Sequence, residues 1–514
     1  MSRTKNSMIN IAVSLFSKSF SYFITFVYRT VFICTLSAEY LGINGLFTNI
    51  LSVLSLAELG VGTAIVYSLY QPIASGDSEK IKSFMQLYRR LYTAIGIFIM
   101  ALGLCLTPFL SVFVNDMPDI PNIELIYVLY VINFSVSYFV LYGQTIIAAH
   151  QKSYINSLYK QSVVFVMTIL QCVLLICFHN YLGTLVLQLT STLVSGGLLI
   201  AKARKLFPYL EDKDIAPIEI NEKRTIKKNI FAMLHHHLGT VIVLCTDNLL
   251  ISKFVGVVAV GLYSNYVLIT SGLASILATI ISSITASVGN LGTSENKGHQ
   301  LEVFYDIFFL FSICLGMITV CLAVLLQPFI ALWIGESYMM STEIVIMIVV
   351  NFYLLAMRKP ALMCHDTYGL FWYDRYKPIV EAMINLGASL ILAPKFGVIG
   401  VLLGTAISTI TVCLWVEPFV LYKYVYECSV WKYFRRYAKY TLCMLVVMAV
   451  TFRITGGFTG TVVAVFLKKL GVCVVVVPVS YWVLMHRWKE WRRLDVRLSN
   501  CGCRTLWCCI RSRS

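Results

Sequence analysis

The chain has 514 residues, of which 58% are hydrophobic and 13% are charged, and its formal net charge is +16 at pH 7. Soluble domains carry roughly 25% charged residues, so this composition excludes an ordinary soluble enzyme or binding domain. Apolar runs of about 20 residues recur along the whole length, and each can cross a bilayer as a helix. The runs are continuous rather than alternating, which excludes a transmembrane β-barrel. We therefore predict a polytopic all-α membrane protein.

The apolar runs predict about 14 transmembrane helices. They are expected at residues 8–36, 41–70, 88–111, 122–148, 157–178, 181–203, 229–252, 258–288, 301–326, 342–360, 377–394, 397–423, 434–453 and 461–485. The first run follows a basic segment, as in a signal peptide. It is too long for a signal-peptide core and lacks a small-residue cleavage site, so we interpret it as a retained helix.

The distribution of basic residues predicts the orientation. An even number of helices places both termini on the same side of the membrane. Of the 41 Lys and Arg residues, 34 lie in segments on that side, whereas the opposite loops hold only Lys253, Lys395 and Arg453. Loops rich in Lys and Arg stay in the cytoplasm, so both termini are expected there. The positive net charge follows from this asymmetry, and we expect no nucleic-acid partner.

The loops and cysteines limit the function further. No outer loop exceeds about 15 residues, which leaves no room for a soluble catalytic domain, so we expect no enzymatic activity. The 16 cysteines are scattered, mostly within predicted helices, and do not indicate a disulfide framework. We interpret the Cys-rich end of the chain as part of a basic tail against anionic lipid rather than as a zinc site.

Two short segments repeat each other. Residues 41–47 read LGINGLF at the start of the second predicted helix, and residues 260–266 read VGLYSNY at the start of the eighth. Aligning Gly42 with Gly261 gives an offset of 219, under which six helices map onto six helices of the same direction. This pattern predicts a parallel repeat with a site between the two halves.

The repeat and the charge distribution together predict the division of the chain. The expected parts are an N-terminal six-helix bundle (1–203), a basic cytoplasmic linker (204–228), a C-terminal six-helix bundle (229–423), two further helices (424–485) and a basic cytoplasmic tail (486–514). The two bundles are expected to be pseudo-symmetric.

Polar side chains recur along one face of the first predicted helix. The stripe consists of Ser14, Lys18, Ser21, Thr25 and Arg29, spaced by three or four residues. Charges inside the membrane usually mark pathways, so this face is expected to line a water-filled cavity that binds an anion. The alternative is a buried structural stripe that neighbouring helices satisfy.

Glu58 stands in the apolar stretch SLAELGVG of the second predicted helix. The first two helices are antiparallel around a turn near Ala38, which places Lys18 and Glu58 at the same depth. The two side chains would then form an ion pair and lower the cost of burying both charges. Alternatively, Glu58 holds a proton or a cation at the cavity.

The offset of 219 maps Lys18 to His237 and Arg29 to Asn248, next to Asp247. We expect Arg29 and Asp247 to face each other across the repeat interface and to help close the outer gate. His237 belongs to a run of three histidines, but successive helical residues point about 100° apart, so the run is not expected to bind a metal. No metal or cofactor is predicted.

Four basic residues are expected at the cytoplasmic interface, where an anionic lipid head would arrive. They are Arg89, Arg90, Lys152 and Arg375. They would serve equally well as anchors whose charged ends reach the interface while their stems stay in the apolar region.

Three stretches together resemble a known family. They are EYLGINGLFTNILSVLSLAELGVG, TDNLLISKFVGVVAVGLYSNY and YKPIVEAMINLGASLILAPKFGVIGVLLGTAIST. They resemble the bacterial polysaccharide transporter family, the Wzx-type lipid-linked oligosaccharide flippases of the multidrug/oligosaccharidyl-lipid/polysaccharide superfamily. The resemblance extends over roughly the first 425 residues. Residues 26–29 also resemble the first-helix arginine segment of the related lipid II flippases, although Thr30 stands where those have Asp.

The resemblance implies two six-helix bundles around a central cavity and two appended helices. It implies alternating-access translocation of an undecaprenyl-pyrophosphate-linked glycan to the outer leaflet of a bacterial plasma membrane, for capsule, exopolysaccharide or O-antigen synthesis. A polysaccharide polymerase and glycosyltransferases would be partners. A pyrophosphate needs cations where water is excluded, so Lys18 and Arg29 would hold it. Glu58 or Asp247 would couple a cation or bias the gate.

Two alternatives remain open. A multidrug or cation antiporter of the same superfamily would favour acidic cavity residues without paired cations. A membrane polymerase or ligase acting on the same lipid carrier would need catalytic residues on a substantial outer loop.

Overall fold

The computed structural model describes residues 3–58, 61–110, 120–150, 152–211, 246–294, 296–370, 373–488 and 490–493, with side chains from Phe16 onward. Every regular element in these ranges is a helix. Eleven helices of the described ranges are long and apolar enough to cross a membrane. The predicted class is confirmed: the chain is a polytopic all-α membrane protein.

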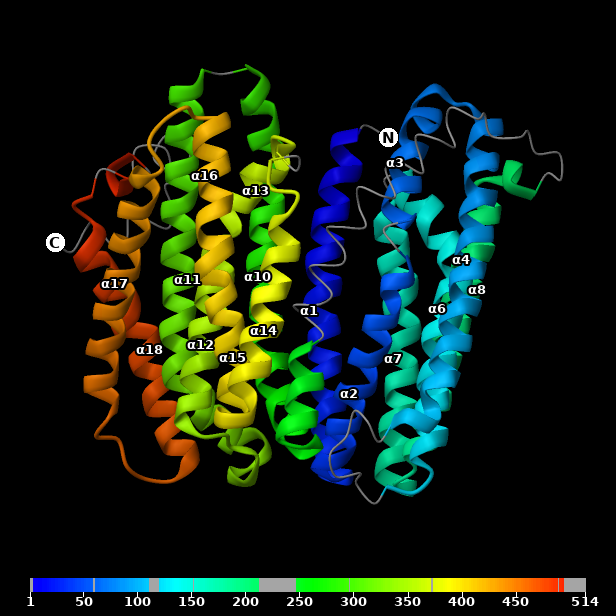
Figure 1. Cartoon of the computed structure of the whole chain (residues 1–514), viewed down its shortest axis with the longest axis horizontal. Helices are drawn as coiled ribbons and strands as arrows, with labels where there is room; N and C mark the ends of the chain where they lie inside the picture. The colour runs from blue at the N-terminus through cyan, green and yellow to red at the C-terminus, as the bar shows by residue number, and fades with distance from the viewer. Residues whose placement is uncertain are drawn as a thin grey trace. The chain divides into compact units, whose positions relative to one another are not determined.

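The helices of the first half are α1 (Arg3–Thr35), α2 (Ala38–Leu54), α3 (Val61–Ser75), α4 (Ser78–Leu106), α6 (Ile123–Ala149), α7 (Ser153–Phe178) and α8 (Tyr181–Leu206) (Figure 1). Residues 246–254 are also helical. The later helices are α10 (Val257–Ser294), α11 (Lys297–Ile334), α12 (Thr342–Met357), α13 (Lys359–Thr367), α14 (Lys377–Phe396), α15 (Val398–Ser408), α16 (Leu414–Tyr424), α17 (Trp431–Thr455) and α18 (Val462–Met485). The helices predicted at 122–148, 157–178, 181–203 and 461–485 agree with these bounds within four residues.

The prediction of one continuous helix over residues 41–70 was wrong. The segment consists of α2, a 3-10 turn over Ser55–Glu58, and α3. The Ser55 hydroxyl donates to the Ser52 carbonyl oxygen at 2.5 Å, which competes with helical bonding of the backbone. The glycines of SLAELGVG lower the helix propensity further. The break divides the run into pieces of 17 and 15 residues.

Residues 71–90 and 358–377, which were counted among the cytoplasmic segments from their Lys and Arg residues, are largely helical. In the predicted loop 71–90, α4 begins at Ser78 because the Asp77 carboxylate accepts a hydrogen bond from the Lys80 amide at 3.0 Å. An acidic N-cap of this kind stabilises the first helical turn. The predicted loop 358–377 contains α13, which continues the span of α12 beyond Pro360.

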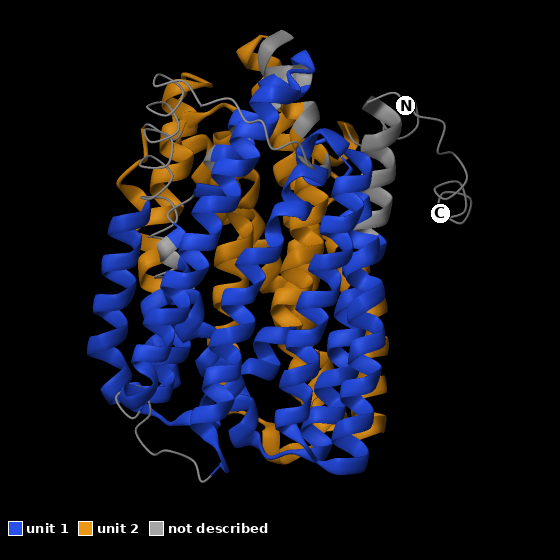
Figure 2. Cartoon of the chain, turned by 90° about the vertical axis from the view of Figure 1, so that its right-hand side faces the viewer, with its two compact units in different colours: residues 1–268, 378–405 blue, residues 269–377, 406–514 orange. Residues whose placement is uncertain are grey.

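The chain folds into two compact units, shown in blue and orange in Figure 2. Unit 1 comprises residues 1–268 and 378–405, and unit 2 comprises residues 269–377 and 406–514. Most of the predicted linker 204–228 lies outside the described residues. The division into two bundles on either side of it stays a prediction.

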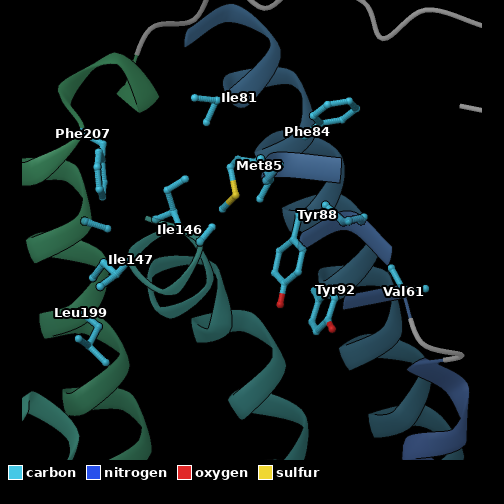
Figure 3. Packing of buried hydrophobic residues seen from close by; sticks show 14 of the residues in the cluster. Val61, Ile81, Phe84, Met85, Tyr88, Tyr92, Ile146, Ile147, Leu199 and Phe207 are labelled. Carbon is cyan, nitrogen blue, oxygen red and sulfur yellow. The ribbon is translucent and has the colours of Figure 1, made fainter. Parts of the chain in front are cut away.

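The core of unit 1 contains a cluster between α3, α4, α6 and α8 (Figure 3). Met85, Ile146 and Leu199 are fully buried there. Glycines let α6 and α8 approach closely, since a Cβ at Gly143 would lie 2.8 Å from the backbone of Ile200. Small residues at helix crossings are the usual means of packing helices in membranes.

In unit 2, α11 packs against α12, α17 and α18. Aromatic rings fill the contact with α17, where the Phe308 ring lies 5.0 Å from that of Tyr433 and 5.3 Å from that of Tyr440. The last two predicted helices are therefore packed on the bundle rather than separate from it.

Candidate functional site

Helix α2 and the first part of α10, which both belong to unit 1, cross in direct backbone contact. A Cβ atom at Gly42 would lie 2.0 Å from the carbonyl oxygen of Val257. A Cβ atom at Gly261 would lie 2.4 Å from the carbonyl oxygen of Ala38. Since backbone atoms cannot rotate away, only glycine fits at either position.

These two contacts are related by the offset of 219. Val257 stands 219 residues after Ala38, and Gly261 stands 219 residues after Gly42. Ala38 and Val257 are thus equivalent positions of the two copies, and so are Gly42 and Gly261. The glycine of each copy contacts the Ala38 or Val257 position of the other copy, which is the pattern of a two-fold, self-complementary interface. The repeated glycine segments of the sequence lie at the crossing of the two copies.

Arg29 lies beside this crossing. Its Nη1 donates to the Ser264 hydroxyl at 3.1 Å, and that hydroxyl donates to the Gly261 carbonyl oxygen at 2.7 Å. The offset maps Arg29 to Asn248 and Ser264 to Gly45, and a Cβ at Gly45 would lie 4.0 Å from the Asn248 Nδ2. The equivalent positions thus lie close together in both copies, but only the first copy carries a cation.

Tyrosines surround Arg29. Tyr28, Tyr130 and Tyr181 lie close enough to interact with its charge, and the Tyr130 and Tyr181 hydroxyls are 2.9 Å apart. Within the described residues the guanidinium has its one hydrogen bond to Ser264 and no carboxylate partner. An arginine offers five N–H donors, so this half-buried side chain retains the capacity to bind an anion.

The rest of the predicted stripe on α1 is less distinctive. Lys18 and Thr25 are exposed and Ser21 is half-buried, while the side chain of Ser14 lies outside the described ones. The Thr25 hydroxyl donates to the Ser21 carbonyl oxygen at 2.8 Å, so it is satisfied within its own helix. The cavity-lining role of this face stays a prediction.

Glu58 ends the 3-10 turn that interrupts the second predicted helix. The Tyr92 hydroxyl donates to the Glu58 Oε1. The Tyr92 ring (Figure 3) stacks on that of Tyr88 with centroids 4.1 Å apart. The Thr145 hydroxyl donates to the Tyr88 hydroxyl at 2.9 Å. Tyr92 is therefore the partner that the structure gives Glu58, and the proposed pair with Lys18 stays a prediction.

Asp247 has a partner other than the expected Arg29. The Thr405 hydroxyl lies 3.4 Å from the Asp247 Oδ2 and accepts a hydrogen bond from Asn385 at 3.1 Å. Helices α14 and α15, which carry Asn385 and Thr405, place these groups on Asp247. In the structure Arg29 donates to Ser264 on α10, and its expected pairing with Asp247 at the outer gate stays a prediction.

The surroundings of Asp247 are rich in acceptors. Its Oδ1 and the Oδ1 of Asn385 are both buried without a hydrogen-bond partner. Orphaned oxygens of this kind fit a proton or a small cation held between helices. In the described ranges no group of three or more His, Cys, Asp or Glu residues could hold a metal ion. His237 lies outside the described residues.

The predicted interface cations lie on separate elements. Arg89 and Arg90 are exposed on α4. The Lys152 Nζ lies 5.6 Å above the Phe207 ring, and the Arg375 guanidinium lies 4.7 Å from the Tyr376 ring. Burial lowers the pKa of the nearby His150, so its imidazole is neutral at pH 7. Cations over neighbouring rings are typical of interface anchors.

The sequence did not predict an ion network buried in unit 2. The fully buried Glu417 of α16 accepts hydrogen bonds from Arg358 Nε at 3.1 Å and from Lys377 Nζ at 2.6 Å. Lys377 also lies 3.6 Å from Asp374, which is 3.3 Å from the Nε2 of His365. Glu417 stands inside a predicted membrane helix, and an acid in that position was the signal that could have revealed the network.

Residues 7–285, more than half of the chain, match the model of a family described as polysaccharide biosynthesis protein. The chain belongs to this polysaccharide biosynthesis protein family. No curated protein sequence matches it. The matched range of this family member includes the α2–α10 crossing, Arg29, Glu58 and Asp247.

Solved structures share the fold of this polysaccharide biosynthesis protein. The lipid II flippase MurJ in an inward closed conformation has a TM-score of 0.65 at 15% identity, over 93% of this chain and 98% of that chain. An inward-facing MATE family multidrug transporter of the MOP superfamily has a TM-score of 0.58 at 14% identity, over 78% and 94%. A mutant of the Vibrio cholerae MATE transporter VcmN has a TM-score of 0.54 at 14% identity, over 83% and 99%.

These structures are of a flippase and transporters, not of enzymes. At such identities the likeness concerns the fold alone. The family match confirms the resemblance to polysaccharide transporters noted in the sequence.

Proposed function

We propose that the protein is a flippase that moves an undecaprenyl-pyrophosphate-linked oligosaccharide from the cytoplasmic to the outer leaflet of a bacterial plasma membrane. It would work by alternating access, with both termini in the cytoplasm. The glycosyltransferases that make the glycan and the polymerase that extends it would be its partners. The family membership and the flippase fold support this function. The observation that carries it is Arg29, a half-buried cation without a carboxylate partner among the described residues.

The chemistry of the substrate fits this arginine. A pyrophosphate diester carries two negative charges, and a guanidinium can bind two of its oxygens at once. Arg29 stands at the crossing of the two repeats, where a transporter of this symmetry is expected to hold its substrate. The surrounding tyrosines offer hydroxyls and ring faces for the first sugar.

Arg29→Ala is expected to lower glycan export at least tenfold, since a hydrogen bond to a charged group contributes about 1.5–3 kcal/mol. Export is measured as the appearance of lipid-linked glycan in the outer leaflet of cells that lack the natural protein. Arg453→Ala, at the exposed end of α17, is the matched control and should export normally. Normal export by Arg29→Ala at equal membrane abundance would contradict the proposed role.

We propose further that Asp247 couples transport to a monovalent cation or a proton. The Asp247 carboxylate and the Asn385 amide each have one buried oxygen without a hydrogen-bond partner. A bound cation would satisfy both oxygens. Helices α14 and α15 contact Asp247 through Asn385 and Thr405, so binding of a cation there would change how these helices pack. Glu58, held by Tyr92, is the second candidate for this role.

Asp247→Asn is expected to abolish the response of export to an imposed sodium or proton gradient, because the neutral amide no longer favours a cation. The measurement is export in proteoliposomes with and without each gradient. Glu79→Gln, on the exposed start of α4, controls for the loss of a carboxylate. A gradient response that survives in Asp247→Asn would show that coupling lies elsewhere.

A multidrug or cation antiporter is the second candidate. The orphaned carboxylate of Asp247 favours it, because cation exporters need an acid in a buried site. Arg29 favours an anionic substrate instead. Drug exclusion that depends on Asp247 and not on Arg29 would support the antiporter.

A further inference from the structure

Unit 2 contains a pocket that belongs to neither of these sites. Its volume is about 640 Å³, which lies within the usual range of about 300–1,000 Å³ for small-molecule sites. It lies between α11, α17 and the residues that follow α18. It is lined by Gly298, Leu301, Glu302, Tyr305, Arg436, Glu490, Arg492 and Arg493.

Two arginines of this pocket have buried N–H groups without acceptors. The Nε atoms of Arg436 and Arg493 are both buried and have no hydrogen-bond partner. Arg436 is nevertheless fixed, since its guanidinium lies 3.6 Å from the centroid of the Tyr305 ring and its Nη1 donates to the Lys432 carbonyl oxygen. Arg493 is fixed by the buried Asp306 at 3.2 Å. Buried donors are almost always paired, so these two call for an acceptor from a ligand.

The acids of the pocket do not supply that acceptor. Glu490 lies 3.7 Å from the Arg436 Nε, and Glu302 lies 3.8 Å from an Arg493 nitrogen. Both distances exceed those of hydrogen bonds. The Glu302 side chain is 60% exposed and remains available to a cation. The pocket therefore presents positive donors and a negative acceptor side by side, as a ligand with both signs of charge would require.

The depth of the pocket indicates where such a ligand comes from. Arg492 and Arg493 follow α18, whose candidate membrane span ends at Met485, and Glu302 and Tyr305 lie in the first turns of the span of α11. On α17, three residues after Arg436, the Lys439 Nζ lies 3.4 Å above the ring of Trp488. Tryptophan and lysine at the end of a span are typical of the membrane–water interface, where phospholipid headgroups lie.

We propose that this pocket binds the headgroup of a zwitterionic phospholipid. Arg436 and Arg493 hold the phosphate, and Glu302 holds the ammonium group. The shared chemistry is a phosphate group, which a membrane lipid or soluble inorganic phosphate could provide. The position at the interface and the exposed carboxylate favour an aminophospholipid such as phosphatidylethanolamine.

The test is native mass spectrometry of the purified full-length protein after exchange into detergent with phosphatidylethanolamine, phosphatidylglycerol or inorganic phosphate. Phosphatidylethanolamine is expected to be retained in preference to phosphatidylglycerol. Arg436→Gln should weaken its retention about tenfold, as expected for the loss of a charged hydrogen bond. Arg435→Gln, an exposed neighbour on α17, should leave retention unchanged.

Glu302→Gln gives a second readout that does not disturb the buried pair of Arg493 with Asp306. It should abolish the preference for phosphatidylethanolamine while phosphatidylglycerol is still retained. Equal retention of the two lipids by the unaltered protein would overturn the assignment of Glu302. Unchanged retention in Arg436→Gln would overturn the site, and competition by inorganic phosphate as effective as by lipid would overturn the lipid as its ligand.

Discussion

Replacing Gly261 with alanine is expected to deprive the cell of most of the folded protein. The added Cβ would lie 2.4 Å from the Ala38 carbonyl oxygen and 3.0 Å from the Gly42 nitrogen, both of them backbone atoms. Overpacked cores lose about 1–3 kcal/mol even where side chains can move aside, and here α2 itself must move. Gly42→Ala should behave alike, because its Cβ would lie 2.0 Å from the Val257 carbonyl oxygen.

The measurement is the fraction of detergent-extracted protein that elutes as a single species in size-exclusion chromatography, together with glycan export. Gly387→Ala is the control, since a Cβ on that helical glycine of α14 meets nothing within 4 Å. It should keep or raise stability, because alanine favours a helix by about 1 kcal/mol over glycine. If Gly261→Ala and Gly387→Ala were equally well folded, the close crossing of α2 and α10 would not be required.

The two glycines also show how far the sequence could be used to predict the structure. Their repetition gave the offset of 219, and the structure places them in reciprocal contact. The apolar runs predicted most helices, because membrane helices must satisfy their backbone internally and so need length and apolarity above all. These features depend on the chain's local composition and periodicity.

Side-chain partners were harder to predict. Arg29 was singled out from the sequence as an intramembrane cation, but its bond to Ser264 depends on the rotation of α10 about its axis. Glu58 was placed level with Lys18 by a depth argument that assumed a continuous second helix, whereas the 3-10 turn presents it to Tyr92. Depth can be read from residue number, but the facing of a side chain changes by about 100° with each residue.

The network around Glu417 was missed for a related reason. Arg358 and Lys377 were counted as cations of a cytoplasmic loop, whereas α13 and the start of α14 place them in the interior. They stand 59 and 40 residues from Glu417 in sequence. No periodic pattern joins such distant residues, so only the tertiary fold could reveal that they share one carboxylate.

The position of Glu417 leads to the second large effect that we expect. Glu417→Ala should lower the free energy of unfolding by about 3–5 kcal/mol, because it leaves the buried Arg358 without a counter-charge and Lys377 with only Asp374 at 3.6 Å. The Glu417 side chain has no exposed surface, and those of Arg358 and Lys377 are 12% and 6% exposed. The loss is measured by thermal or chemical unfolding in detergent.

An exposed ion pair of the same unit provides the control. Lys297 and Glu427 are 2.6 Å apart, but their side chains are 56% and 62% exposed. Exposed pairs contribute about 0–1 kcal/mol, so Lys297→Ala should have little effect. A loss in Glu417→Ala no larger than in Lys297→Ala would show that water or another group compensates the two cations.

A triple replacement separates the loss of attraction from the penalty of burial. Arg358→Met, Lys377→Met and Glu417→Leu together remove all three charges and retain much of the side-chain volume. Apolar replacement of buried ion pairs is often neutral or stabilising, and Asp374 keeps its contact with His365 at 3.3 Å, so the triple variant should recover most of the stability that Glu417→Ala loses. If it remained as unstable as Glu417→Ala, the network would stabilise unit 2 by its specific geometry. In that case Arg358 and Lys377 would be needed to hold their segments to Glu417 on α16. Recovery of stability without recovery of export would instead indicate that the charges are retained for transport.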